Sequence, residues 1–458
     1  MTFEPGLSRA PAVALGLAAM LIFALAAVAA RTAAAPAAVV TAAAPAPALA
    51  PAPRAAAVTA AAPRAAAVPV GRDTEPVVLS GEQLGHFLGL AVSRVGVWAY
   101  RDSSWARIAS QVDQRDGDGA FVPVEGADRL DGNDELVFTA GALGDARPGA
   151  DSWPPGVSQE LSPATIVVDD PLGAGEIGRA YVFDSPPDSP TPAVAFDSAT
   201  NEIRSTAYVL GFATAEDGYF GLKRLSLLGD ERDRVDRSKF RLSIPQLGEF
   251  TEEDLGAFGV VPRVEPLIEG PVRLVMDASG ASTAYAERAT LLGLDLPIDE
   301  IPLIPGVEIR LSLDLDPSAV GATYRDENIP SGVLVDGQPD TVRVLPFPMW
   351  REVVFEEGRL VSLAAGAPPP IVVRGYYKDD ATPDDADTGD LASYGDTGVV
   401  AVLLSGLIDV GFLGQMVVLE PDDPVNAEDL AEQLAHPLLL HVDVAPKQWP
   451  VHLPLCTK

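Results

Sequence analysis

From Pro76 onward, hydrophobic and polar residues alternate in short runs that predict β-strands. Residues 307–316 (VEIRLSLDLD) alternate without a fault, which is the period of two expected of a half-buried strand. The pair Asp336-Gly337 between residues 333–335 and 342–344 predicts a hairpin. Further strands are predicted at 165–168, 180–183, 203–209, 272–276, 351–355 and 371–377, whereas helical periodicity is confined to 80–90 and 426–435. The pattern therefore favours an all-β fold, a large antiparallel β-sandwich, over an α/β fold.

A long apolar run at 399–419 (VVAVLLSGLIDVGFLGQMVVL) has two interpretations. Its length is that of a membrane-spanning helix. However, Asp409 lies at its centre, and Gly406, Gly411 and Gly414 interrupt it. A charge and several glycines in the middle favour two buried strands joined by a glycine turn.

The N-terminus has the features of an export signal. Arg9 precedes an uncharged apolar stretch at 10–30, and Ala27-Val28-Ala29 offers a cleavage site of small residues. Residues 1–30 are therefore predicted to be a signal peptide or, if they are not cleaved, a signal anchor, since the stretch is just long enough to span a bilayer. In both cases the rest of the chain is expected outside the cytoplasm, and this segment is the only expected contact with a membrane.

Residues 31–72 are an Ala/Pro-rich repeat, which predicts a semi-extended linker or a disordered leader. The remainder is predicted to divide into a small β module at 73–160 and a β-sandwich domain at 161–458. The turn-rich segment 144–158 (GDARPGADSWPPGVS) marks the expected boundary.

The folded part of the chain is strongly acidic. Residues 1–72 contain one acid and five arginines, so 64 of the 65 acidic and 27 of the 32 basic residues follow residue 72, a net charge of −37. Such a surface disfavours nucleic acid and anionic lipid as partners, and polyanionic glycans more weakly. Cys456 is the only cysteine, so no intrachain disulfide can form, and stability must come from a large core or from bound ions.

Acidic residues are densest in the segment 111–138, where glycines separate them and an apolar strand follows. Carboxylates at alternate positions, then a glycine and a distal glutamate, are typical of a calcium loop. Gln114 occupies the first ligand position, where aspartate is expected. A solvated acidic hairpin, with Asp and Gly serving turn geometry, is the alternative. The predicted calcium ligands are Asp116, Asp118, Glu125, Asp131, Asn133 and Glu135.

A second acidic segment at 378–396 directly follows a predicted strand that contains Arg374, Tyr376 and Tyr377. Arg374 and Tyr376 lie on the same face of that strand. A tyrosine as general acid or base beside an arginine that neutralises a carboxylate suits a glycan-processing cleft, so these three are the catalytic candidates. An ordinary strand followed by a solvated loop is the alternative.

Two segments carry a family resemblance. Residues 111–140 resemble a pattern in uncharacterised exported bacterial proteins, in which Q-V/I-D-E-R-D-x-D-G leads into L-D-x-N-D-E-L-V-F, and 229–255 with 269–273 resemble the middle of the same group. That group resembles the supersandwich architecture of galactose mutarotase-like and polysaccharide lyase-like domains. The resemblance implies a carbohydrate partner and brings no catalytic motif. We therefore expect glycan binding or processing with structural calcium; the alternative is a non-enzymatic surface or interaction protein tethered by the linker.

Overall fold

The computed structural model describes residues 68–117, 119–123, 128–149, 152–173, 175–188, 191–257, 264–278, 281–297, 306–340, 345–365, 371–403 and 409–444. The chain folds into two compact units. The small unit comprises Ala34–Ser189 and Leu438–Lys458, and the large unit contains Pro190–Pro437. Within the described residues, no helix is long and apolar enough to cross a membrane.

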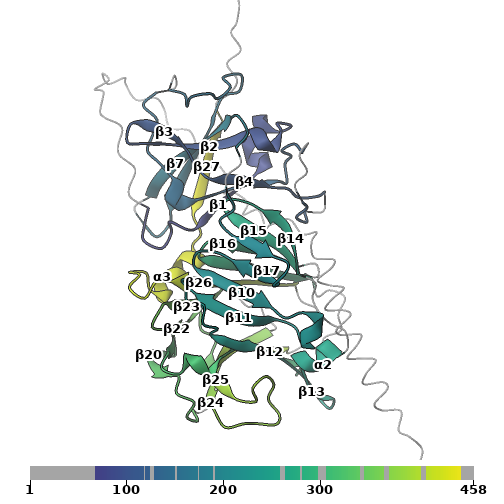
Figure 1. Ribbon diagram of the computed structural model, residues 1–458. Coiled ribbons are helices and arrows are strands. Elements are labelled where there is room, and N and C mark those ends of the chain that lie inside the picture. Colours follow the sequence, from purple (N-terminus) through teal and green to yellow (C-terminus); the bar gives the residue numbers. More distant parts are fainter. Residues whose placement is uncertain are drawn as a thin grey trace, which may run out of the picture. The chain divides into compact units, whose positions relative to one another are not determined.

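The small unit contains two antiparallel sheets (Figure 1). One has the strand order β1 (Pro76–Ser80), β5 (Glu135–Thr139), β4 (Ser110–Asp113). The other has the order β27 (Leu439–Val444), β6 (Ala164–Asp170), β7 (Gly175–Asp184), β2 (Val95–Arg101), β3 (Ser104–Arg107). Short 3-10 helices occupy Gly81–Phe87, Val92–Arg94 and Ala140–Ala142. Apolar residues of both sheets form one core, which includes Leu79, Val97, Phe138, Ile166 and Val182.

The division into units differs from the predicted boundary near residue 160. Strands β6 and β7 lie beyond that boundary, yet β7 pairs with β2, and β6 pairs with β27 from the C-terminal end of the described chain. The turn-rich segment predicted as the boundary instead packs on the small unit, because Trp153 and Val157 contact the aromatic cluster of Trp98, Tyr181 and Phe183. Turn chemistry marked a loop correctly but did not mark a domain end.

The large unit contains three sheets. The four-stranded sheet has the order β11 (Leu222–Leu227), β10 (Tyr208–Phe212), β9 (Glu202–Arg204), β8 (Ala195–Asp197). The six-stranded sheet has the order β13 (Gly248–Thr251), β12 (Val235–Ile244), β18 (Glu308–Leu315), β25 (Ser393–Leu403), β24 (Ile371–Asp380), β21 (Leu345–Pro346). The nine-stranded sheet has the order β14 (Val264–Glu269), β15 (Arg273–Ala278), β16 (Ala281–Ala286), β17 (Ala289–Pro297), β26 (Asp409–Leu419), β23 (Arg359–Ala365), β22 (Trp350–Val354), β19 (Thr323–Asp326), β20 (Ile329–Leu334).

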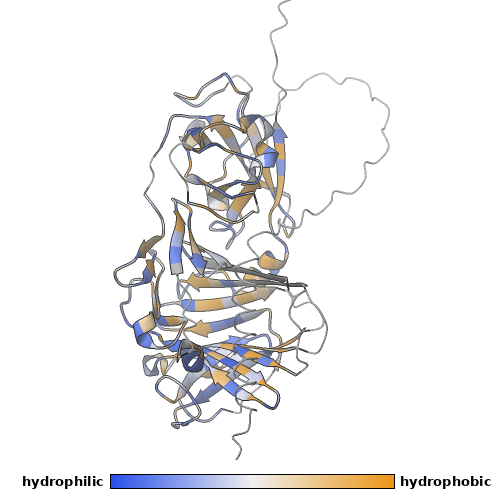
Figure 2. Cartoon of the chain, turned by 90° about the vertical axis from the view of Figure 1, so that its right-hand side faces the viewer, coloured by the Kyte–Doolittle hydropathy of each residue, from blue (hydrophilic) through white to orange (hydrophobic). Residues whose placement is uncertain are grey.

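The core of the large unit lies between these sheets. It combines Leu210 of the four-stranded sheet, Tyr377 of the six-stranded sheet, and Leu360 and Val418 of the nine-stranded sheet. On β23 and β26 the neighbouring residues point the other way, where they pack against helix α3 (Ala427–Ala435). Alternation along each strand thus supplies both faces of the nine-stranded sheet, and Figure 2 shows hydrophilic and hydrophobic residues alternating along the strands. The other helices among the described residues of this unit are α2 (Glu252–Ala257) and 3-10 turns at Ala215–Asp217 and Pro317–Ala319.

Most element predictions agree with the structure, and the all-β antiparallel sandwich is confirmed. The faultless alternation at 307–316 is β18, and the helical pattern at 426–435 is α3, capped by Asn426, whose Oδ1 accepts the amide of Asp429 at 2.7 Å. The apolar run at 399–419 forms two strands, β25 and β26, as predicted, and they belong to different sheets. The hairpin prediction is partly outside the described residues, which lack 341–344; β20 pairs with β19.

Candidate functional site

One face of the six-stranded sheet is polar. Because directly paired residues of antiparallel strands share a face, the register defines two rows across it. One row runs Lys239, Ser312, Gly398, Tyr376, and the next runs Arg241, Arg310, Val400, Arg374. The opposite face carries Leu313 and Tyr377, which belong to the core or pack against it. This sheet therefore presents cations on one side while it closes the core with the other.

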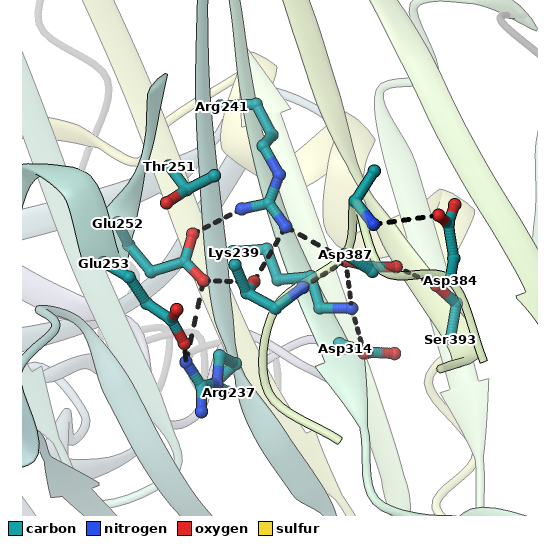
Figure 3. A network of polar contacts seen from close by, with 12 residues as sticks. Arg237, Lys239, Arg241, Thr251, Glu252, Glu253, Asp314, Asp384, Asp387 and Ser393 are labelled. Carbon is teal, nitrogen blue, oxygen red and sulfur yellow. Dashed lines mark hydrogen bonds and ion pairs between the residues drawn. The ribbon is translucent and has the colours of Figure 1, made fainter. Parts of the chain in front are cut away.

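The loop between β24 and β25 folds back onto this polar face (Figure 3). Its Asp387, with 7% of the side chain exposed, lies 2.9 Å from Nζ of Lys239 and accepts a hydrogen bond of 3.0 Å from Nη2 of Arg241. Lys239 is fully buried and also contacts Oδ2 of Asp314 at 2.6 Å and the carbonyl of Ala392 at 2.9 Å. Burial alone would lower the pKa of Lys239, but the surrounding acids Asp314, Asp396 and Asp387 raise it, so the ammonium stays charged.

Arg241 is the second buried cation of this cluster. Its Nη1 donates to Glu252 at the start of α2, and its Nη2 donates to Oγ1 of Thr388 at 2.7 Å. Glu252 in turn accepts from the Thr388 hydroxyl and from the backbone amide of Phe240. The side-chain partners of Arg241 thus come from α2 and from the β24–β25 loop, and the guanidinium ties both to β12.

The buried acids of the cluster have divergent pKa values. Burial, followed by the charge of Asp396, raises the pKa of Asp314 to about 8 in spite of Lys239. Asp387 behaves oppositely: burial would raise its pKa, but Lys239 and the hydrogen bonds that it accepts hold it well below its usual range. Asp396 is 1% exposed, and neither of its carboxylate oxygens has a hydrogen-bond partner within the described chain. Divergent pKa values occur in catalytic sites and in structural ion-pair clusters alike, and the burial of these acids fits the latter.

Three acids of this region have the spacing of a metal site. One carboxylate oxygen each of Asp236, Asp314 and Asp390 lie within 4.8 Å of one another. Their chemistry argues against a resident cation, because Nζ of Lys239 already contacts Asp314 and the backbone amide of Asp390 points to Asp236 at 3.4 Å. The ammonium of Lys239 therefore already pairs with one of the three acids.

The three residues predicted as catalytic lie in different environments. Arg374 is exposed, whereas Tyr376 and Tyr377 are buried on opposite faces of β24. Tyr377 stacks on Tyr324 in the core, with ring centroids 4.2 Å apart. Tyr376 accepts a hydrogen bond of 3.1 Å from Nη1 of Arg310, whose guanidinium carbon lies 4.6 Å from the Tyr376 ring centroid. Burial, and then the nearby Asp396, raises the pKa of Tyr376 far above its usual range.

In the small unit, the acidic segment 114–134 joins β4 to β5, which pair from Asp113–Glu135 to Ser110–Phe138. The described carboxylates mostly bind backbone amides. Asp134 is fully buried and accepts from the amides of Arg115 and Asp131, while Oδ1 of Asp131 accepts from the amides of Asn133 and Asp134. Oδ1 of Asp116 accepts from the amide of Ala120 at 2.9 Å.

The six residues predicted as calcium ligands therefore differ in their surroundings. Two of them, Asp118 and Glu125, lie outside the described residues. The guanidinium of Arg115 contacts Glu135 at 2.6 Å and lies 3.8 Å from the Phe121 ring centroid, so Glu135 already has a cation. Asp116 and Asn133 are adjacent, because the side-chain amide nitrogen (Nδ2) of Asn133 donates to the backbone carbonyl of Asp116. The other three, Asp116, Asp131 and Asn133, lie in the described part of this connection, and calcium stays a prediction.

Sequence reasoning missed Lys239, Arg241 and Glu252. A signal for two of them was present, because Arg237, Lys239 and Arg241 alternate along one strand and so share a face. Glu252 has no such signal, since its contact depends on how α2 follows β13.

No family model matches the chain, and no curated protein matches it. Solved structures of three glycosidases are similar over part of the chain. They are an α-mannosidase from Enterococcus faecalis (11% identity, TM-score 0.36, 76% of this chain and 40% of that one), an α-N-acetylgalactosaminidase from Bifidobacterium bifidum (13%, 0.30, 48% and 36%) and a family GH92 α-mannosidase from Bacteroides thetaiotaomicron (8%, 0.25, 54% and 31%). The alignments cover less than half the length of each enzyme.

Proposed function

We propose that the protein is an extracytoplasmic carbohydrate-binding protein, and that its ligand lies along Arg310, Arg374 and Tyr376 on the polar face of the six-stranded sheet. The observation that supports this most directly is the Arg310 guanidinium held over the Tyr376 ring, in the same row as the exposed Arg374. Planar hydrogen-bond donors fixed on a rigid sheet suit the hydroxyl-rich edge of a sugar.

The site favours binding over bond cleavage. A tyrosine general base must lose its proton, and the raised pKa of the buried Tyr376 opposes that. Tyr376 accepts a hydrogen bond from Arg310 and so fixes where the guanidinium points. Its role in the proposal is therefore to position Arg310, while Arg374 contacts the ligand.

Export and calcium are parts of the same proposal. The apolar stretch at 10–30 would direct the chain out of the cytoplasm, where millimolar calcium is available to the small unit. Asp116, Asp131 and Asn133 would supply oxygen ligands, together with Asp118 and Glu125. The ion would brace the β4–β5 connection and take no part in ligand binding.

The binding proposal can be tested on a panel of immobilised oligosaccharides with the full-length protein. We expect binding that Arg374→Ala reduces at least about tenfold, the usual effect of removing a hydrogen bond from a charged group. Arg204→Ala is the matched control: Arg204 is also an exposed arginine of the large unit, and its partner Glu202 keeps a second cation, Arg224. Wild-type protein that binds no oligosaccharide would contradict the proposal and favour a non-enzymatic interaction protein.

A further inference from the structure

Two arginines on the polar face lack an acidic partner in a chain that has acids in excess. Within the described residues, neither Arg310 nor Arg374 has a carboxylate within the 4.0 Å of an ion pair, although most arginines of the large unit do, such as Arg234, Arg241 and Arg359. Nε of Arg310 is buried and has no hydrogen-bond partner in this part of the chain. A buried donor without an acceptor costs free energy of folding, which binding of an acceptor would recover.

The register places these two arginines in the same row of the sheet, with one strand between them. Arg310 of β18 and Arg374 of β24 both pair with Val400 of the intervening β25, so they occupy one row and one face. Neighbouring strands are about 4.8 Å apart, so the two Cα atoms lie roughly 10 Å apart. Two arginine side chains at that separation can both contact one group placed between them.

The other end of the same row shows how it takes an anion. Arg241 pairs directly with Arg310, and the chain's own carboxylates, Glu252 and Asp387, bind its guanidinium (Figure 3). Internal anions thus bind this row at Arg241, while no carboxylate of the described residues forms an ion pair with Arg310 or Arg374.

We propose that Arg310 and Arg374 form a subsite for a single oxyanion, the carboxylate or sulfate group of an acidic sugar, an inference that rests on the proposed carbohydrate binding. Guanidinium groups match the planar oxygen pairs of these anions and bind them through charged hydrogen bonds. Three acids lie beyond ion-pair distance of Arg310 but still interact electrostatically with its guanidinium: Asp396, Glu249 and Asp387. Together with the acidic surface, they favour a ligand with one negative group over a polyanion.

The test uses the full-length protein, with sodium sulfate and glucuronate as probes, glucose as the neutral comparison, and constant ionic strength. We expect sulfate and glucuronate to raise the melting temperature saturably and glucose to leave it unchanged. Arg374→Ala should raise the half-saturation concentration of both anions at least about fivefold, whereas Arg204→Ala should not change it. Because sulfate also stabilises proteins by exclusion from their surface, the difference between the two variants is the decisive quantity.

Equal responses of wild type and Arg374→Ala would overturn the subsite. The oligosaccharide panel separates this failure from that of the proposed function. Equal anion responses in a protein that still binds glycans would retain carbohydrate binding and reject the subsite. An anion-induced rise in melting temperature that depends on Arg374, in a protein that binds no glycan, would support the oxyanion subsite and reject carbohydrate as the ligand.

Discussion

The two acidic loops of this protein are similar in composition, but their carboxylates have different kinds of partner. In the small unit, the carboxylates of the β4–β5 connection bind nearby backbone amides and one local arginine, Arg115. In the large unit, the β24–β25 loop sends Asp387 inward to Lys239 and Arg241, which are about 146 residues away in sequence. The described carboxylates of the first loop thus bind local groups, whereas Asp387 of the second loop binds cations that a distant strand supplies.

The difference shows that acid density does not determine where a carboxylate points. Both loops place Asp and Gly where turns need them. In the large unit, the alternating Arg237, Lys239 and Arg241 of β12 provide charge beneath the loop, and a buried acid there has a cation to meet. In the small unit, Asp134 instead accepts hydrogen bonds from backbone amides.

The largest effect should come from removing the buried cation of the second loop. Lys239→Met would leave Asp387, Asp396 and Asp314 without the ammonium, and breaking a buried ion pair typically destabilises a protein by about 3–5 kcal/mol. Lys223→Met is the matched control, because Lys223 forms a partly exposed pair with Asp217, and such a pair contributes up to about 1 kcal/mol. Denaturant unfolding measures both.

Two outcomes of that measurement would separate the explanations. Similar losses in the two variants would mean that the ammonium is not essential to the cluster. A large loss for Lys239→Met that calcium restores would instead show that the site of Asp236, Asp314 and Asp390 takes a metal ion once the lysine is gone.

How far the sequence predicts this molecule follows from the range of each contact. Alternation alone gave β18, because a period of two is a local property. The cap of α3 is local as well, since Asn426 binds an amide three residues away. By contrast, the pairing of β27 with β6 joins residues about 270 positions apart, and neither segment has a sequence feature that predicts which strand it pairs with. The domain boundary was missed for that reason.

The site shows the same limit. The sequence placed Arg374 and Tyr376 on one face of a strand, as the structure does, but it could not place Arg310 beside them. Burial is also a property of the assembled sheet. Tyr376 as a proton-transfer group was therefore a reasonable hypothesis from residue type, and its buried position supports a positioning role.

A change of one pH unit is expected to have a smaller effect. The pKa of Asp314 is raised from its ordinary value of 3.8 to about 8, so the folded state holds a proton that the unfolded state releases above pH 4. The contribution of Asp314 to the free energy of unfolding is fully present below pH 4, and it decreases by up to about 1.4 kcal/mol per pH unit until pH 8. Asp314→Asn cannot ionise at this position and should remove that slope, whereas Asp385→Asn, which changes an exposed acid of the β24–β25 loop, should retain it. Parallel stability–pH curves for wild type and Asp314→Asn would contradict the raised pKa.

The smallest expected effect tests the first loop. If calcium binds between β4 and β5, then a concentration tenfold above the dissociation constant stabilises the folded protein by about 1.4 kcal/mol, which raises the melting temperature by a few degrees. Asp116→Asn should abolish that increase, and Asp385→Asn should not. Arg115→Ala sharpens the comparison between the loops, because it frees Glu135 to bind the ion and should enlarge the calcium response. A melting temperature that calcium and chelator leave unchanged in all four proteins would show that both loops are built without a metal ion.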